Sequence, residues 1–173
     1  QSIDMKGFNM KKRPLGKTGL SVSEIAFGTV SLGMPYGIEV KGHGGMPPES
    51  ESIKLLETAL DKGVNFYDTA RSYGCSEEII GKAFKGRRDD VVIATKSSHF
   101  LDEQGRLYPK NKLAKVFKES LEQSLRALQT DYIDLYMSHT GKQEVINSPD
   151  IMELMAEHKA KGVIKAAGVS TYT

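Results

Sequence analysis

Short apolar runs alternate with segments of helical period along most of the chain, and this alternation limits the fold more than any other feature of the sequence. An apolar run of about four to eight residues, followed by a longer segment with apolar residues every three or four positions, is typical of a βα unit. Successive βα units build a parallel sheet. The predicted strands are residues 24–28, 64–68, 91–96, 133–139 and 163–170.

The segments between these strands carry helix signals. Apolar residues in 111–128 recur at three- and four-residue spacing, which marks one buried face. Residues 76–84 begin with a serine, a favourable N-cap, followed by two glutamates that suit a first turn. Met152 and Met155 are expected on the inner face of the last helix. The predicted helices are residues 49–60, 76–84, 111–128 and 150–160.

Three other segments fall outside this alternation, within what we take as a single domain over residues 1–173. Residues 12–24 contain two extended pieces around a Gly-Lys-Thr-Gly turn and predict a β-hairpin. Residues 34–48 are rich in glycine and proline and predict a flexible loop, either at the active-site end of the sheet or without a role. Residues 1–10 are expected to be a tag remnant or flexible leader.

An open doubly wound sheet and an eight-stranded barrel both fit this pattern. Residues 28–33, after the first strand, do not supply the G-x-G-x-x-G motif of a dinucleotide-binding sheet, so we favour a (β/α)8 TIM barrel. Such barrels need about 250 residues, whereas this chain has 173. We therefore expect about the first five strands and four helices, with a missing C-terminal half or another chain completing the ring.

The charge balance and the cysteine content limit the classes of molecule that the chain is expected to bind. The chain has 24 lysines and arginines against 22 acidic residues, which predicts neither nucleic-acid nor membrane binding. No apolar stretch approaches the roughly 20 residues of a membrane span, and no secretory signal is visible, so a cytoplasmic protein is expected. Cys75 is the single cysteine, too few for an internal disulfide or a typical metal site. The expected partner is a small molecule, with no metal.

Three consecutive predicted strands end in ionisable residues, Asp68, Lys96 and His139. Because the carboxyl ends of parallel strands meet at one edge, where barrel enzymes carry their active sites, we expect the three side chains to share one site. Tyr73 follows in a turn that Gly74 allows to fold back over the strand ends. A nearby ammonium lowers the pKa of a phenol, ordinarily about 10, so Lys96 could make Tyr73 a better proton donor.

The same residues also have plain structural interpretations. Asp68 with Lys96 alone would more often be a structural ion pair, His139 a satisfied polar residue, and Tyr73 a half-buried loop aromatic. Together they predict proton transfer to a substrate oxygen. Asp134 is out of phase with His139 and is expected to face the helix layer as a hydrogen-bonding residue. The other histidines have no partner spacing, although His99 follows Lys96 closely and could line the site.

The strings GVNFYDTARSYGCSEEIIGKAF, VVIATK, TDYIDLYMSH and KGVIKAAGVS, in this order, resemble the aldo-keto reductase superfamily from KRPLGKTGLSVSEIAFGT to Ser170. The resemblance implies a barrel closed at its bottom by the hairpin, a nicotinamide cofactor across its top, and reduction of aldehydes or ketones to alcohols. It implies that Tyr73 protonates the carbonyl oxygen, that Lys96 and Asp68 tune this phenol, and that His139 orients the carbonyl.

The resemblance also implies a cofactor site. The segment after the first strand resembles the one that touches the nicotinamide ribose, and Ser170 resembles a serine that binds the carboxamide. Many members follow that serine with asparagine, whereas this chain has Thr171, which offers a hydroxyl but no amide. NADP (NADPH) is the family-level expectation and NAD the alternative. The cofactor-binding residues implied are Gly28, Thr29, Val30, Asp68, Ser170 and Thr171.

The resemblance leaves two other functions open. One is a non-catalytic, nucleotide-sensing binding or regulatory subunit on the same fold, and the other is an inactive fragment. The family's adenosine and 2'-phosphate contacts come from later strands and loops. We therefore expect residues 1–173 alone to bind cofactor weakly and to show little turnover.

Overall fold

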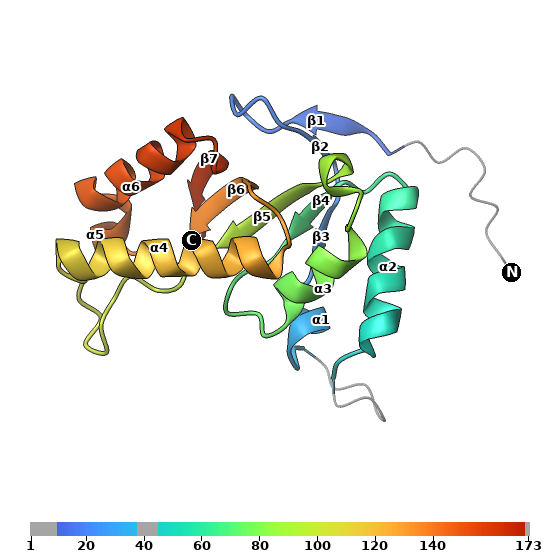
Figure 1. Cartoon of the computed structure of the whole chain (residues 1–173), viewed down its shortest axis with the longest axis horizontal. Coiled ribbons are helices and arrows are strands. Elements are labelled where there is room, and N and C mark those ends of the chain that lie inside the picture. Colours follow the sequence, from blue (N-terminus) through green and yellow to red (C-terminus); the bar gives the residue numbers. More distant parts are fainter. Residues whose placement is uncertain (1–9, 38–44, 172–173) are drawn as a thin grey trace, which may run out of the picture.

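In the computed structural model, which describes residues 10–37 and 45–171, five parallel strands form one sheet in chain order (Figure 1). Every neighbouring pair is parallel, so all five carboxyl ends lie along one edge. The α/β class and the five strands are confirmed, with bounds within two residues of those predicted. The strands are β3 (Ala26–Gly28), β4 (Phe66–Asp68), β5 (Val92–Lys96), β6 (Ile133–Ser138) and β7 (Ile164–Val169).

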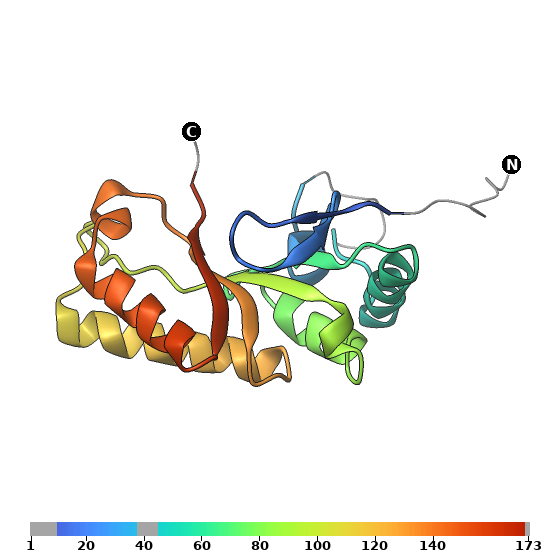
Figure 2. The same cartoon turned by 90° about the horizontal axis from the view of Figure 1, so that it is seen from above.

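The four predicted helices are confirmed, each within one residue at both ends. Figures 1 and 2 show α3, α4 and α6 on the same side of the sheet. The predicted helices are α2 (Glu49–Asp61), α3 (Ser76–Ala83), α4 (Lys110–Ala127) and α6 (Pro149–Ala160). Three short helical segments were not expected from the sequence: α1 (Val30–Gly33), α5 (Gln143–Ile146) and the 3-10 helix η1 (Arg88–Asp90).

The core lies between the sheet and these helices. Tyr67 and Tyr136 point outward from β4 and β6 and are fully buried, and the ring of Tyr136 packs edge-on against Phe117 of α4. On the opposite face, Leu135 and Met137 are only half-buried. The sheet ends at β3 and β7, its two edge strands. The described residues therefore form about half of a barrel wall, covered by helices outside and open inside.

The outer face of β7 beside α6 remains partly uncovered. An apolar groove there is lined by α5, α6 and β7, and includes Met152 and Val169. Met155 is buried as expected, but Met152 is 55% exposed, so its assignment to the core was wrong. Met152 lies on the flank of α6 that faces this groove, and no helix in the described part of the chain covers it.

The predicted hairpin is present and lies at the amino-terminal ends of the strands. Strands β1 (Lys12–Pro14) and β2 (Ser21–Ser23) pair antiparallel. The backbone N–H of Ser23 donates to Asn65 Oδ1 (2.7 Å), and the N–H of Asn65 donates back to Ser23 Oγ (3.1 Å). Because Asn65 directly precedes β4, these bonds tie the hairpin to the bottom of the sheet. Residues 1–9 of the expected leader and 38–44 of the expected flexible loop lie outside the described residues.

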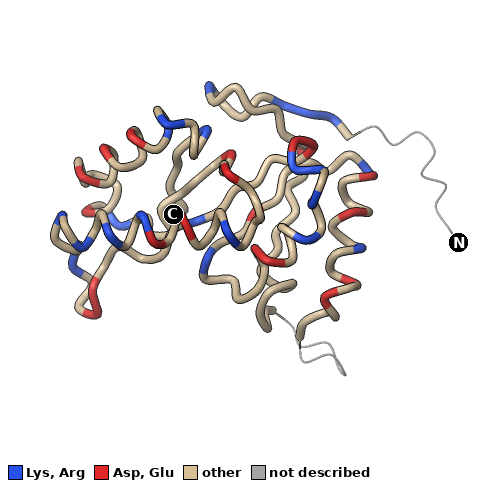
Figure 3. Tube along the Cα trace, viewed as in Figure 1, with Lys and Arg blue, Asp and Glu red and all other residues tan. Residues whose placement is uncertain are grey.

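Charged residues of both signs are distributed along the described chain, and the outer helices carry acidic as well as basic positions (Figure 3). Within residues 10–37 and 45–171, no helix combines the length and the apolarity that a membrane crossing requires.

One buried charge holds the bottom of the sheet together. Asp134 of β6 is 1% exposed and accepts hydrogen bonds from Arg88 Nη2 (2.7 Å), Lys165 Nζ (2.9 Å) and the backbone N–H of Ile93 (3.0 Å). The predicted hydrogen-bonding role is confirmed. Its partners come from η1 and the two neighbouring strands, however, and not from an α-helix.

Candidate active site

Strand register places the three predicted ionisable residues on one face at the carboxyl edge of the sheet, each two residues further along than the one on the preceding strand. Asp68, the last residue of β4, pairs with Ala94 of β5, and Lys96 lies two residues further along the same face. Lys96 in turn pairs with Met137 of β6, and His139 lies two residues beyond it. Each step of two residues preserves the face, so all three side chains converge on the open side of the sheet.

Lys96 is the centre of the group. Its ammonium donates to Asp68 Oδ1 (2.7 Å), to the carbonyl oxygen of Thr69 (2.9 Å) and to the phenol oxygen of Tyr73 (3.4 Å). The Lys96 side chain is 6% exposed, whereas that of Asp68 is 36% exposed. A nearly buried cation, held by a carboxylate, thus contacts a phenol at the rim of the site.

His139 completes the cluster. Its ring lies edge-on to the ring of Tyr73, with centroids 5.6 Å apart. Burial lowers the pKa of His139 below its ordinary value, the charges of Lys96 and His99 lower it further, and Asp68 opposes them. A neutral imidazole at neutral pH follows. The structure thus brings together all four residues, Asp68, Tyr73, Lys96 and His139, that the sequence placed at one site.

The turn that carries Tyr73 is held by a close approach of two backbones. A β-carbon on Gly33 would collide with the carbonyl oxygen of Tyr73, and one on Gly74 would collide with the carbonyl oxygen of Gly33. Gly74 also has a φ of +56°, which glycine adopts without strain. The N–H of Cys75 donates to the Gly33 carbonyl (3.2 Å). The short helix α1 and the Tyr73 turn therefore fix each other's position.

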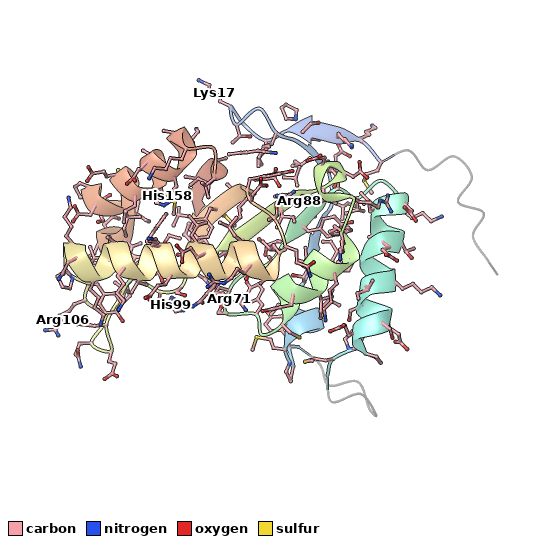
Figure 4. All side chains as sticks on the ribbon, in the orientation of Figure 1. Lys17, Arg71, Arg88, His99, Arg106 and His158 are labelled. Carbon is pink, nitrogen blue, oxygen red and sulfur yellow. The ribbon has the colours of Figure 1, made fainter. Side chains whose placement is uncertain are left out.

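A buried ion pair anchors the same turn from behind. Glu77 of α3 is fully buried, forms an ion pair with Arg71, and accepts a hydrogen bond from Thr95 Oγ1 (2.6 Å). The N–H of Arg71 donates to the carbonyl of Lys96 (3.2 Å). Figure 4 shows Arg71 and His99 at this end of the sheet and Arg88 at the other. Glu77 thereby links the Tyr73 turn to the strand that carries Lys96.

Protonation of Glu77 should make the fold more stable in mild acid. Burial, the largest cause, raises the pKa of Glu77, while Thr95 and Arg71 oppose it. The folded state therefore holds this proton at a higher pH than the unfolded state does. The contribution of Glu77 to the free energy of unfolding is complete below about pH 4.5, its ordinary pKa, and is lost as pH rises through the folded value.

Urea unfolding of the full-length protein and its Glu77→Gln variant, across a series of pH values, measures this effect. The amide cannot titrate, so the stability of the unsubstituted protein relative to the variant should increase as pH falls from neutral. A difference that stays constant with pH, or that shrinks in acid, would contradict the assignment.

The implied cofactor residues lie along the same edge, but they differ in what they can offer. Gly28 is exposed with open space around it, and Thr171 is also exposed. Ser170 is half-buried, with its N–H bonded to the carbonyl of Ser138 (2.8 Å). Val30 is half-buried at the start of α1.

Thr29 is placed differently from the other implied cofactor residues, because it is fully buried. Its hydroxyl donates to the carbonyl of Asp68 (2.9 Å) and accepts from Ser76 Oγ (2.6 Å). The side chain therefore joins the ends of β3 and β4 to α3 and does not present a group to the open face.

Two residues outside the predicted group of four contact His139: Ser72, which the sequence did not single out, and His99, which it gave as a residue that could line the site. Ser72 Oγ lies 3.2 Å from His139 Nδ1, and the ring of His99 stacks on that of His139 with centroids 5.4 Å apart. His99 Nδ1 is in turn 2.8 Å from Thr140 Oγ1. The available signals were the place of Ser72 next to Tyr73 and of His99 three residues after Lys96. In the described part of the chain, no cluster of three or more His, Cys, Asp or Glu residues could hold a metal ion.

Comparison with known proteins identifies the family of the chain. A family model described as "Aldo/keto reductase family" matches residues 24–173. Among curated proteins, the aldo-keto reductase YhdN of Bacillus subtilis is 37% identical over 169 residues, covering 95% of this chain and 48% of the relative. The uncharacterized oxidoreductase YqkF of the same organism is 35% identical over 164 residues, covering 94% of this chain and 49% of the relative.

Solved structures give the same result. The holo form of the aldo-keto reductase AKR11C1 from Bacillus halodurans superposes with a TM-score of 0.73 at 38% identity, covering 94% of this chain and 50% of that structure. The chain thus spans about half the length of the curated relatives it matches.

Proposed function

The chain belongs to the aldo-keto reductase family, and on this premise we propose that its full-length protein reduces the carbonyl group of an aldehyde or ketone to an alcohol with NADPH. The observation that carries the proposal is the contact between the Lys96 ammonium and the Tyr73 phenol oxygen (3.4 Å), with Asp68 bonded to the same ammonium (2.7 Å). A cation in this position stabilises negative charge that develops on the phenol oxygen when the proton is transferred.

Each residue of the cluster has a defined task. Tyr73 donates its proton to the carbonyl oxygen of the substrate as that oxygen becomes negative. Lys96 donates a hydrogen bond to the phenol oxygen and stabilises the charge left there, while Asp68 and the Thr69 carbonyl keep Lys96 in place. His139, neutral, donates from a ring nitrogen to the same carbonyl oxygen and orients it.

The carboxyl edge of the sheet fits a nicotinamide dinucleotide, which when bound supplies the hydride that reduces the carbonyl carbon. Gly28 has no side chain and open space around it, Asp68 is partly exposed, and Ser170 and Thr171 follow β7 at the same edge. These residues would hold the nicotinamide half, together with Val30. Thr29 would act by holding the strand ends, because its hydroxyl is bonded within the protein. NADP is proposed over NAD on the family resemblance, and a cytoplasmic location is proposed with it.

Carbonyl-dependent oxidation of the cofactor tests the proposal. The full-length protein is mixed with NADPH or NADH and a panel of aldehydes and ketones, using cofactor labelled with deuterium at the transferable position. We expect one alcohol formed per cofactor oxidised, deuterium on the carbinol carbon, and higher kcat/KM with NADPH. Residues 1–173 alone should show little turnover in the same assay.

Binding without reduction would contradict the proposal. If the full-length protein binds either cofactor yet reduces no carbonyl compound of the panel, the non-catalytic, nucleotide-sensing subunit is the better assignment.

A further inference from the structure

We propose that Ser72 is a positioning residue that fixes which ring nitrogen of His139 carries the hydrogen. The inference rests on the proposed function, since it concerns how His139 meets the substrate oxygen. It assigns a task to a residue that belongs neither to the proton-donating pair nor to the implied cofactor site.

The two nitrogens of His139 have different surroundings. Nδ1 faces the hydroxyl of Ser72 at 3.2 Å. Within residues 10–37 and 45–171, no group forms a hydrogen bond with Nε2, which is therefore the nitrogen available to a substrate. A neutral imidazole has one N–H, so the hydrogen on Nε2 requires Nδ1 to act as the acceptor. A hydroxyl can donate to Nδ1 or accept from it. In the donating role, which leaves Nε2–H for the carbonyl oxygen of the substrate, Ser72 stabilises this tautomer.

The surroundings of the His139 ring favour its neutral form, in which only one of the two nitrogens carries a hydrogen. The groups that face His139 are Lys96 on β5, His99 after β5, and Asp68 and Tyr73 on β4 and its following turn. Burial, the largest cause, and the ammonium of Lys96 favour a neutral ring over an imidazolium, although Asp68 opposes them. An imidazolium would donate from both nitrogens whatever Ser72 did, whereas a neutral ring needs a partner that selects one.

The wrong tautomer would oppose the reaction. With hydrogen on Nδ1, the lone pair of Nε2 would face the lone pairs of the carbonyl oxygen, and the orienting hydrogen bond would be lost. The plane of the ring is set separately, because His99 stacks on it at an interplanar angle of 18° and is itself bonded to Thr140 (2.8 Å). His99 thus holds the ring's orientation, and Ser72 selects its hydrogen.

Ser72 makes few contacts that stabilise the fold, so its replacement can be interpreted through His139. It is exposed, and within the described residues its hydroxyl has His139 as its single side-chain partner. Replacing it should therefore change the imidazole without unfolding the turn. The turn itself is held by Arg71 and by the contact between Gly33 and Gly74.

The test uses Ser72→Ala and Ser72→Thr in the full-length protein. NMR chemical shifts of the two imidazole nitrogens report the tautomer of His139 directly, and the signals are assigned by their loss in His139→Gln. We expect hydrogen on Nε2 in the unsubstituted protein, a mixture of tautomers in Ser72→Ala, and recovery in Ser72→Thr, which keeps the hydroxyl. In parallel, kcat should fall about tenfold in Ser72→Ala, the loss of one hydrogen bond, with KM nearly unchanged.

The outcomes separate this inference from the proposed function. Hydrogen on Nδ1 in the unsubstituted protein, or an unchanged tautomer in Ser72→Ala, would overturn the role of Ser72 even if the protein is an active reductase. The expected tautomer change in a protein without carbonyl reduction would leave the role of Ser72 supported and the proposed function wrong. A fall in kcat that Ser72→Thr does not restore would also count against it.

Discussion

Replacing Tyr73 by phenylalanine should lower kcat for carbonyl reduction by about 10²–10⁴-fold, the usual contribution of a general acid, with cofactor affinity nearly unchanged. The phenol oxygen is the atom that Lys96 contacts, at 3.4 Å, and the ring that remains keeps its edge-on contact with His139. The substitution therefore removes the proton donor and little else. Steady-state kinetics with the best substrate, and cofactor titration by fluorescence, measure the two effects.

A matched control is Tyr132→Phe. Tyr132 lies at the opposite end of β6 from His139, and its hydroxyl donates to Asp89 (2.8 Å). The same loss of a hydroxyl there should leave kcat within experimental error. Turnover that survives Tyr73→Phe would show that another group donates the proton, whereas equal losses in both variants would indicate damage to the fold.

The sheet and its main helices could be predicted because their signals are local. The spacing of Leu113, Phe117 and Leu121 is enough to define the buried face of α4, and all three are buried. The short helices α1 and α5 gave no such signal, since four residues hold barely one helical turn. Met152 was misassigned because its burial depends on what covers α6, which no local pattern records.

The acid, lysine and histidine of the site could be predicted for a related reason. Each stands at or just after a strand end, so parallel pairing alone brings them to one edge. The partnership of Glu77 with Arg71 and Thr95 could not be read, since two glutamates in the first turn of a helix are usually solvated partners of its dipole. Thr29 stays a prediction as a cofactor residue. Its hydroxyl is buried and bonded to the Asp68 carbonyl, so the resemblance predicts where Thr29 lies and not what its side chain contacts.

Asp134→Leu should destabilise the full-length protein by about 3–5 kcal/mol, the usual cost of removing one partner from a buried ion pair. The leucine would leave Arg88, whose side chain is 15% exposed, without its carboxylate, and the buried N–H of Ile93 without an acceptor. Urea unfolding at neutral pH measures the loss as a lower midpoint at constant slope. The active site lies at the other end of β6, so kcat of the folded fraction should be unchanged.

Two further substitutions separate the contribution of the Asp134 charge from that of its partner Lys165. Asp134→Asn keeps an oxygen for the Ile93 N–H and removes only the charge, so it should cost less than leucine. Lys165→Met removes the partner that is 45% exposed, and partly solvated pairs contribute little, so it should cost at most about 1 kcal/mol. If Lys165→Met proved as damaging as Asp134→Leu, the pair across β6 and β7 would be the main contact. A loss confined to Asp134 variants instead means that its carboxylate holds the sheet through Arg88 and the β5 backbone.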